Sequence, residues 1–204
     1  MIQPSAEATT PREVAAVSAF RIARPNGWWG MVMLIATEAS LFGVLIASFF
    51  YLRFKAVQWP PSGDTEPKLL VPILLTVMLV STSVPMQVAA SAARRGRVGL
   101  ARLGILVTLL VGGVYLGIQV HRVLVSLKTL KPSDDAYASI VYTLAVGHHA
   151  HVALGLLIDL YLAARLVRGL TSYRAIGVEA AALYWHFVNV LAILVTATLL
   201  SPSV

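Results

Sequence analysis

The sequence predicts an all-α integral membrane protein with five transmembrane helices. Of its 204 residues, 58% are hydrophobic and only 12% are charged, whereas a soluble domain is about 25% charged. Five apolar stretches are each long enough to cross a hydrocarbon core of about 30 Å. Arg residues cluster in the short connections between them, so the net charge of +7 indicates membrane topology and not nucleic-acid binding. The expected spans cover about 29–52, 69–93, 103–120, 139–164 and 180–200.

The N-terminal residues 1–27 are expected to form a cytoplasmic tail in front of a transmembrane domain at 28–200. The tail lacks the basic region, apolar core and cleavage site of a signal peptide, so the first span is expected to serve as its own insertion signal. Within the tail, Thr10-Pro11-Arg12-Glu13 has the pattern of a helix N-cap with a capping-box acid. This pattern predicts a short interfacial helix.

The first span carries a single carboxylate, Glu38, inside the apolar run from Trp28 to Lys55. An acid near the middle of a membrane helix costs about 2.5 to 3.5 kcal/mol, so Glu38 should face other helices or a wet cavity. Two interpretations stay open, a functional acid or a protonated side chain that only hydrogen-bonds a neighbouring helix. We expect Glu38 to be buried and protonated, and to face Asn189 or His186 from the fifth span.

The second and third spans contain helix-shaping residues. The ring of Pro85 removes one backbone hydrogen bond, so the second span should bend there. The hydroxyls of residues 81–83 are placed to bond the freed carbonyls. In the third span, Gly113 and Gly117 form a small-residue pattern that favours close helix packing.

The last two spans hold most of the remaining intramembrane polar residues. His148 and His151 share a helix face by their spacing, which suits a pair of metal ligands or the passage of a proton. A zinc site needs more ligands than this cluster offers, so we predict no metal site and favour hydrogen bonding within the bundle. The candidate residues here are His148, His151, Glu179, Tyr184, Trp185, His186 and Asn189, together with His149 and Asp159.

The distribution of basic residues predicts the orientation. Lys and Arg are more numerous in the tail and in the second and fourth connections than on the other side. The N-terminus is therefore expected in the cytoplasm and the C-terminus outside.

Several sequence runs also carry a resemblance. They resemble subunit III of haem-copper respiratory oxidases, in the short five-helix bacterial form that covers Trp28 to Leu200. The most specific run is Glu179 to Val190, with its order of acid, aromatic residues and histidine. The other runs are Trp29-Gly30-Met31, Thr37-Glu38-Ala39, Phe49-Phe50-Tyr51, His148-His149-Ala150-His151-Val152 and Gly155-Leu156.

The resemblance implies a non-catalytic accessory subunit of an oxygen-reducing complex in the bacterial inner membrane. Such a chain holds no haem or copper, packs against the catalytic subunit I that carries them, lies in one complex with subunit II, and binds phospholipid in a cleft between its helices. Glu38 matches the intramembrane carboxylate of the family that reacts with hydrophobic carbodiimides. Asn189 departs from the pattern, because many members have Asp there, and this weakens a continuous proton relay. The other signature positions are His148, His151, Glu179, Tyr184, Trp185 and His186.

The sequence leaves functional alternatives open. One is an accessory protein of nitric oxide reduction with the same fold. Another is a proton-coupled carrier, which predicts repeats with broken helices in matching positions; Pro85 has no such counterpart.

Three basic residues are candidates for binding lipid headgroups, with simple positive-inside anchoring as the equal alternative: Arg165, Arg168 and Arg174. The electron donor, cytochrome c or a quinol, is not predicted.

Overall fold

The computed structural model describes residues 26–61 and 69–201, and the regular secondary structure within them is entirely helical. The tail and its predicted interfacial helix lie outside the described residues. Five helical segments are long and apolar enough to cross a membrane, with α3 and α4 forming one of them. The predicted fold class, a five-span all-α membrane protein, is thereby confirmed. The helices are α2 (Asn26–Lys55), α3 (Leu70–Ser81), α4 (Ser83–Arg94), α5 (Val98–Ser126), α6 (Ala136–Leu166) and α7 (Ser172–Leu200).

The second span is interrupted at Thr82, between α3 and α4. Pro85 has no N–H, so the carbonyl of the residue four positions earlier, Ser81, loses its helical partner. The chain tightens at this point, where the N–H of Thr82 bonds the carbonyl of Leu79 at 3.0 Å. The bend that Pro85 predicts therefore takes the form of a break three residues before the proline.

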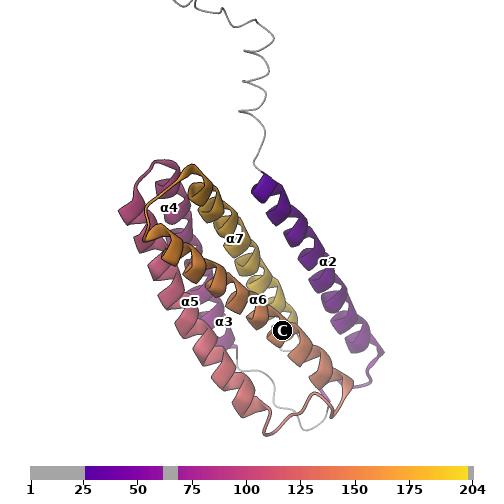
Figure 1. Cartoon of the computed structure of the whole chain (residues 1–204). Coiled ribbons are helices and arrows are strands. Elements are labelled where there is room, and N and C mark those ends of the chain that lie inside the picture. The colour runs from indigo at the N-terminus through magenta and orange to yellow at the C-terminus, as the bar shows by residue number, and fades with distance from the viewer. Residues whose placement is uncertain (1–25, 62–68, 202–204) are drawn as a thin grey trace, which may run out of the picture.

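Helix α7 is the centre of the bundle. Half of its most apolar stretch is buried (50%), compared with 11% for α2. Helix α7 contacts α2, α3, α4 and α6, while α2 contacts only α6 and α7 among the described helices. Figure 1 shows α2 at the edge of the bundle, beside α7 and α6. Most of α2 therefore faces whatever surrounds the chain.

Polar side chains join α7 to the broken second span. Thr196 Oγ1 lies 2.8 Å from Thr76 Oγ1 on α3. Asn189 Nδ2 donates to Ser83 Oγ at 2.7 Å, beside the break. In a third bond, His186 Nε2–H donates to Gln87 Oε1 at 3.0 Å. The partners on α7 come earlier in the chain as those on α3 and α4 come later, so α7 runs antiparallel to the second span. These bonds fix the register of α7 against α3 and α4, because each polar group in an apolar setting needs its partner.

The close contact of α5 with its neighbours occurs at glycines other than those that the sequence pattern indicates. A Cβ at Gly113 or Gly117 would meet nothing within 4 Å, and both residues are exposed. A Cβ at Gly104 would lie 2.5 Å from the carbonyl oxygen of Pro85 on α4. A Cβ at Gly112 would lie 3.2 Å from the ring of Trp185. The expectation that Gly113 and Gly117 pack closely within the chain is wrong, since their helix face points outward.

Two arginines hold the corner between α6 and α7. Arg102 on α5 donates through Nη2 to the carbonyl of Leu166 at 2.6 Å. Arg174 donates through Nη1 to the carbonyls of Arg168 at 3.0 Å and Gly169 at 2.5 Å. Both guanidinium groups thus satisfy carbonyls that the end of α6 leaves without helical partners.

Candidate functional site

Glu38 on α2 and His151 on α6 form the one ion pair among the described residues. Glu38 Oε2 lies 2.8 Å from His151 Nε2. The other ring nitrogen, His151 Nδ1, lies 2.7 Å from the carbonyl oxygen of Gly147, one turn earlier on the same helix. The pair bridges two helices that are far apart in the sequence.

The geometry limits the protonation of this pair. A carbonyl oxygen can only accept a hydrogen bond, so His151 Nδ1 carries a hydrogen and donates to Gly147. The short Nε2–Oε2 contact then needs one further proton, which resides either on the imidazole or on the carboxyl. In both cases Glu38 and His151 together carry no net charge. This neutrality reduces the cost of an acid inside a membrane span.

Aromatic residues enclose the His151 side of the pair. The ring of Phe42, 1% exposed, meets the imidazole edge-on at a centroid distance of 5.2 Å. Tyr184 on α7 donates its hydroxyl to the carbonyl of His151 at 3.0 Å. Contacts from α2 and α6 therefore hold the ring of His151 in one orientation, while α7 binds its backbone carbonyl.

The site remains open on the outer side of the bundle. The side chain of His151 is 17% exposed and that of Glu38 is 24% exposed. In a membrane this exposure is toward lipid or a neighbouring chain, since α2 lies at the edge of the bundle (Figure 1). The acid is thus reachable from outside the chain while its charge is balanced from within.

The predicted partners of Glu38 were wrong. Asn189 and His186 do not face α2; they bond Ser83 and Gln87 on α4. The partner of Glu38 depends on the exact ends of the helices, which the sequence places only approximately. Glu38 lies 12 residues from the start of α2, and His151 lies 15 residues from the end of α6, about one turn apart.

The two histidines that the spacing places on one helix face have different surroundings, and the expected hydrogen bonding within the bundle is found for His151 but not for His148. His148, only 3% exposed, lies with its ring 5.7 Å from that of His149. His151 instead faces Glu38 and Phe42. The two histidines share a helix face by spacing but meet different neighbours. Across 26–61 and 69–201, no three His, Cys, Asp or Glu side chains gather where they could hold a metal ion.

A second buried group lies at Trp185 and Asp159, on the inner side of α7 and α6. Both residues are fully buried, at 0% exposure. The indole N–H of Trp185 and both carboxyl oxygens of Asp159 are buried without a hydrogen-bond partner among the described residues. Asp159 has no cationic neighbour in a described ion pair. Both side chains are closed to the outside of the bundle.

The remaining candidates are separate from the pair. Glu179 lies half-buried in the first half of α7 and bonds no described side chain. Two residues that contact the candidate histidines, Phe42 and Gln87, were not predicted from the sequence. For Phe42 the sequence does contain a signal, because its i, i+4 spacing from Glu38 places both residues on one face of α2.

Removing the carboxyl of Glu38 is expected to cost more than replacing it by an amide. Glu38→Ala leaves the Nε2 atom of His151 without its partner, a loss of about 1–3 kcal/mol. Glu38→Gln can still bond this nitrogen through its amide, so its free energy of unfolding should stay within about 1 kcal/mol of the parent. SDS titration of the purified chain in mixed micelles, followed by circular dichroism, measures both. Equal losses in the two variants would contradict a bonding role for the pair.

The chain matches known proteins over most of its length. The profile of a family described as cytochrome c oxidase subunit III matches residues 17–200. Among relatives named cytochrome c oxidase subunit 3, that of Thermostichus vulcanus is 32% identical over 79% of this chain and 80% of its own length. That of Synechocystis is 33% identical over 79% and 70%. That of Bacillus subtilis is 30% identical over 81% of both chains.

Proposed function

The chain belongs to the cytochrome c oxidase subunit III family, and we propose that it is the non-catalytic subunit III of a bacterial haem-copper terminal oxidase. Family membership makes it a multi-pass membrane subunit of a cytochrome oxidase complex. The observation that carries the non-catalytic role is the neutral, helix-bridging pair of Glu38 and His151. Such a pair ties α2 to the bundle, as suits a chain whose work in the complex is structural. Haem and copper then belong to the partner, subunit I.

We propose that the chain stabilises subunit I by direct packing beside subunit II. The support is the large apolar surface that α2 leaves uncovered, which includes Met33 at 64% exposure and Val44 at 65%. In lipid such a surface associates through close packing and a few polar contacts. The partly exposed Glu38 supplies one such polar group at the same edge of the bundle.

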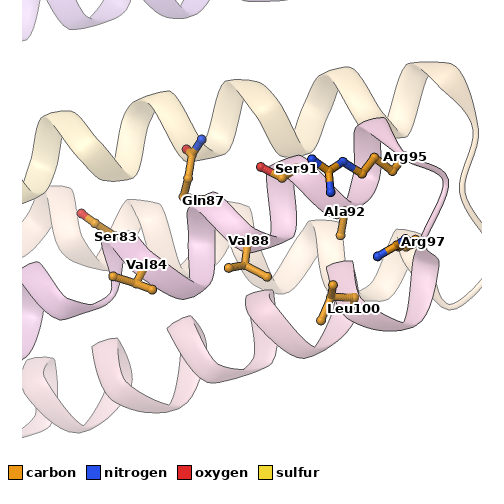
Figure 2. Close-up of a pocket in the computed structure, with 9 residues that line it drawn as sticks. All are labelled: Ser83, Val84, Gln87, Val88, Ser91, Ala92, Arg95, Arg97 and Leu100. Atoms are coloured by element: carbon orange, nitrogen blue, oxygen red, sulfur yellow. The ribbon is translucent and has the colours of Figure 1, made fainter.

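A groove on α4 supports the binding of structural phospholipid. It has a volume of about 440 Å³ and runs along Val84 and Val88 to Arg95 and Arg97. Figure 2 shows the two arginines at one end of this groove, with the apolar side chains along its length. Guanidinium groups match phosphate oxygens, and apolar walls match an acyl chain. The proposed occupant is an anionic phospholipid with its headgroup at Arg95 and Arg97.

The three arginines predicted to bind headgroups have different surroundings. Arg168 is exposed and remains a candidate. Arg165 lies over the ring of Tyr161, 5.7 Å from its centroid, and remains a second candidate. Arg174 is engaged with two carbonyls of the α6–α7 connection, so its main role is to hold that connection.

We propose that the N-terminus lies in the bacterial cytoplasm and the C-terminus outside the inner membrane. The α4–α5 and α6–α7 connections lie at the same end of the bundle (Figure 1). Arg95, Arg97 and Arg168 lie in these connections, and basic residues favour the cytoplasmic side.

Purification in mild detergent tests the proposed assembly. The chain should copurify with a haem-copper subunit that shows haem absorption and reduces oxygen. Glu38→Gln should leave the complex assembled with most of its turnover, because the amide retains the bond to His151. Nitric oxide turnover without oxygen turnover would indicate the alternative, an accessory protein of nitric oxide reduction.

Two results of the same preparation would contradict the proposal. One is complete loss of oxygen reduction in an assembled Glu38→Gln complex, since an accessory subunit does not carry the reaction. The other is unchanged phospholipid content, by mass spectrometry, after Arg95→Gln and Arg97→Gln are combined, which would remove the headgroup assignment.

A further inference from the structure

A cavity lies inside the bundle between α3, α5, α6 and α7, in the half opposite the α4 groove. Its volume is about 280 Å³. It is bounded by Ser126 and Leu130, where α5 ends, and reaches inward to His148. This end of the bundle is the lower one in Figure 1. The polar side chains that line it include Tyr115, Gln119, Arg122, Tyr142, His148 and His149.

His148 is a deeply buried polar residue of this cavity and lacks hydrogen-bond partners among the described residues. It is 3% exposed, and neither Nδ1 nor Nε2 has a hydrogen-bond partner among the described residues. From the first residue of α6, Ala136, it is about 18 Å along the helix axis. A buried imidazole without hydrogen bonds costs free energy, and natural proteins usually satisfy such groups with protein or water.

The other polar groups divide into two sets. Gln119 Nε2 donates to the hydroxyl of Tyr115 at 3.2 Å, and the hydroxyl of Tyr142 lies 2.8 Å from Ser126 Oγ. These bonds fix the positions of the wall. Arg122 and His149 line the same space and form no hydrogen bond or ion pair with a described residue. A guanidinium and two imidazoles thus line one cavity without a hydrogen-bond or ion-pair partner among the described residues.

Water fits this cavity by size and by chemistry. At about 30 Å³ for each molecule, the volume holds on the order of nine waters. Polar cavities of this kind are filled by water, whereas dry cavities are lined by apolar groups. We propose that this cavity is a water-filled vestibule, open at the end where α5 meets α6, that brings solvent to the imidazole of His148. The vestibule is a property of this chain alone and does not depend on the proposed oxidase function.

Cysteine labelling in the assembled complex tests the vestibule. The chain has no cysteine, so any label on it reports an introduced thiol. Ala145→Cys and Val141→Cys place thiols in the cavity wall. Val146→Cys is the matched control, because this neighbour is 46% exposed on the outer face of the bundle. Thr129→Cys, in the exposed connection between α5 and α6, reports which vesicle orientation presents that end to the reagent.

A charged, membrane-impermeant thiol reagent should distinguish these positions. Applied from the side that labels Thr129→Cys, it should react with Ala145→Cys on the order of tenfold faster than with Val146→Cys, since only a hydrated thiol forms the thiolate. Val141→Cys should react at least as fast, being closer to the opening. Equal rates at 145 and 146 would overturn the proposal, as would labelling of Ala145→Cys only from the opposite side. Retention of each variant in the complex, checked by copurification, keeps the comparison valid.

Discussion

Replacing Trp185 by alanine is expected to lower the free energy of unfolding of the bundle by about 3 kcal/mol. The indole is fully buried, at 0% exposure. It lies between the backbones of α5 and α6, because Cβ atoms at Gly112 and Gly155 would come within 3.2 and 3.3 Å of its ring. Truncating a buried Trp costs about 3–5 kcal/mol in soluble proteins. Lipid is itself apolar, so the lower end of that range applies here.

The measurement is an SDS titration of the purified chain in mixed micelles, with helix content followed by circular dichroism. Trp29→Ala is the matched control, because Trp29 is 52% exposed and its loss should change the free energy by no more than about 0.5 kcal/mol. Trp185→Phe should have an intermediate effect, since it keeps a ring between the two glycines and loses the N–H beside Asp159. A Trp185→Ala loss as small as that of Trp29→Ala would refute the central role of this residue.

The number and class of the helices could be predicted from the sequence because both depend on local properties. A run of apolar residues long enough to span the membrane must form a helix, since lipid offers no partner for its backbone groups. The break at Thr82 also has a local cause, the missing N–H of Pro85. Such features do not depend on how one helix is rotated against another.

The partners within the bundle could not be predicted for a physical reason. In a soluble protein the polar face of a helix points to water, but here lipid and bundle interior are equally apolar. Apolarity therefore does not distinguish the exposed Gly113 from the buried Gly112. For the same reason the pairing of Glu38 with His151 could not be predicted. It depends on how α2 and α6 are rotated and on where each helix begins and ends.

Replacing Gly104 by alanine is expected to destabilise the bundle by about 1–3 kcal/mol, as overpacking does. The added Cβ would lie 2.5 Å from the carbonyl oxygen of Pro85 and 2.9 Å from the Cβ of Ala89. These are a backbone atom and the first atom of a short side chain, so neither can rotate away. Helices α4 and α5 must therefore move apart at the point where the second span is already broken.

Gly113→Ala, nine residues later on the same helix, separates this packing effect from helix propensity. A Cβ there meets nothing within 4 Å, and alanine favours a helix over glycine by about 1 kcal/mol in water. The two Gly→Ala changes are chemically identical, so opposite signs in the same SDS titration assign the difference to the contact with Pro85. A loss for Gly113→Ala equal to that for Gly104→Ala would contradict the contact. Retention of each variant in the purified complex then shows whether the α4–α5 contact is also needed for assembly.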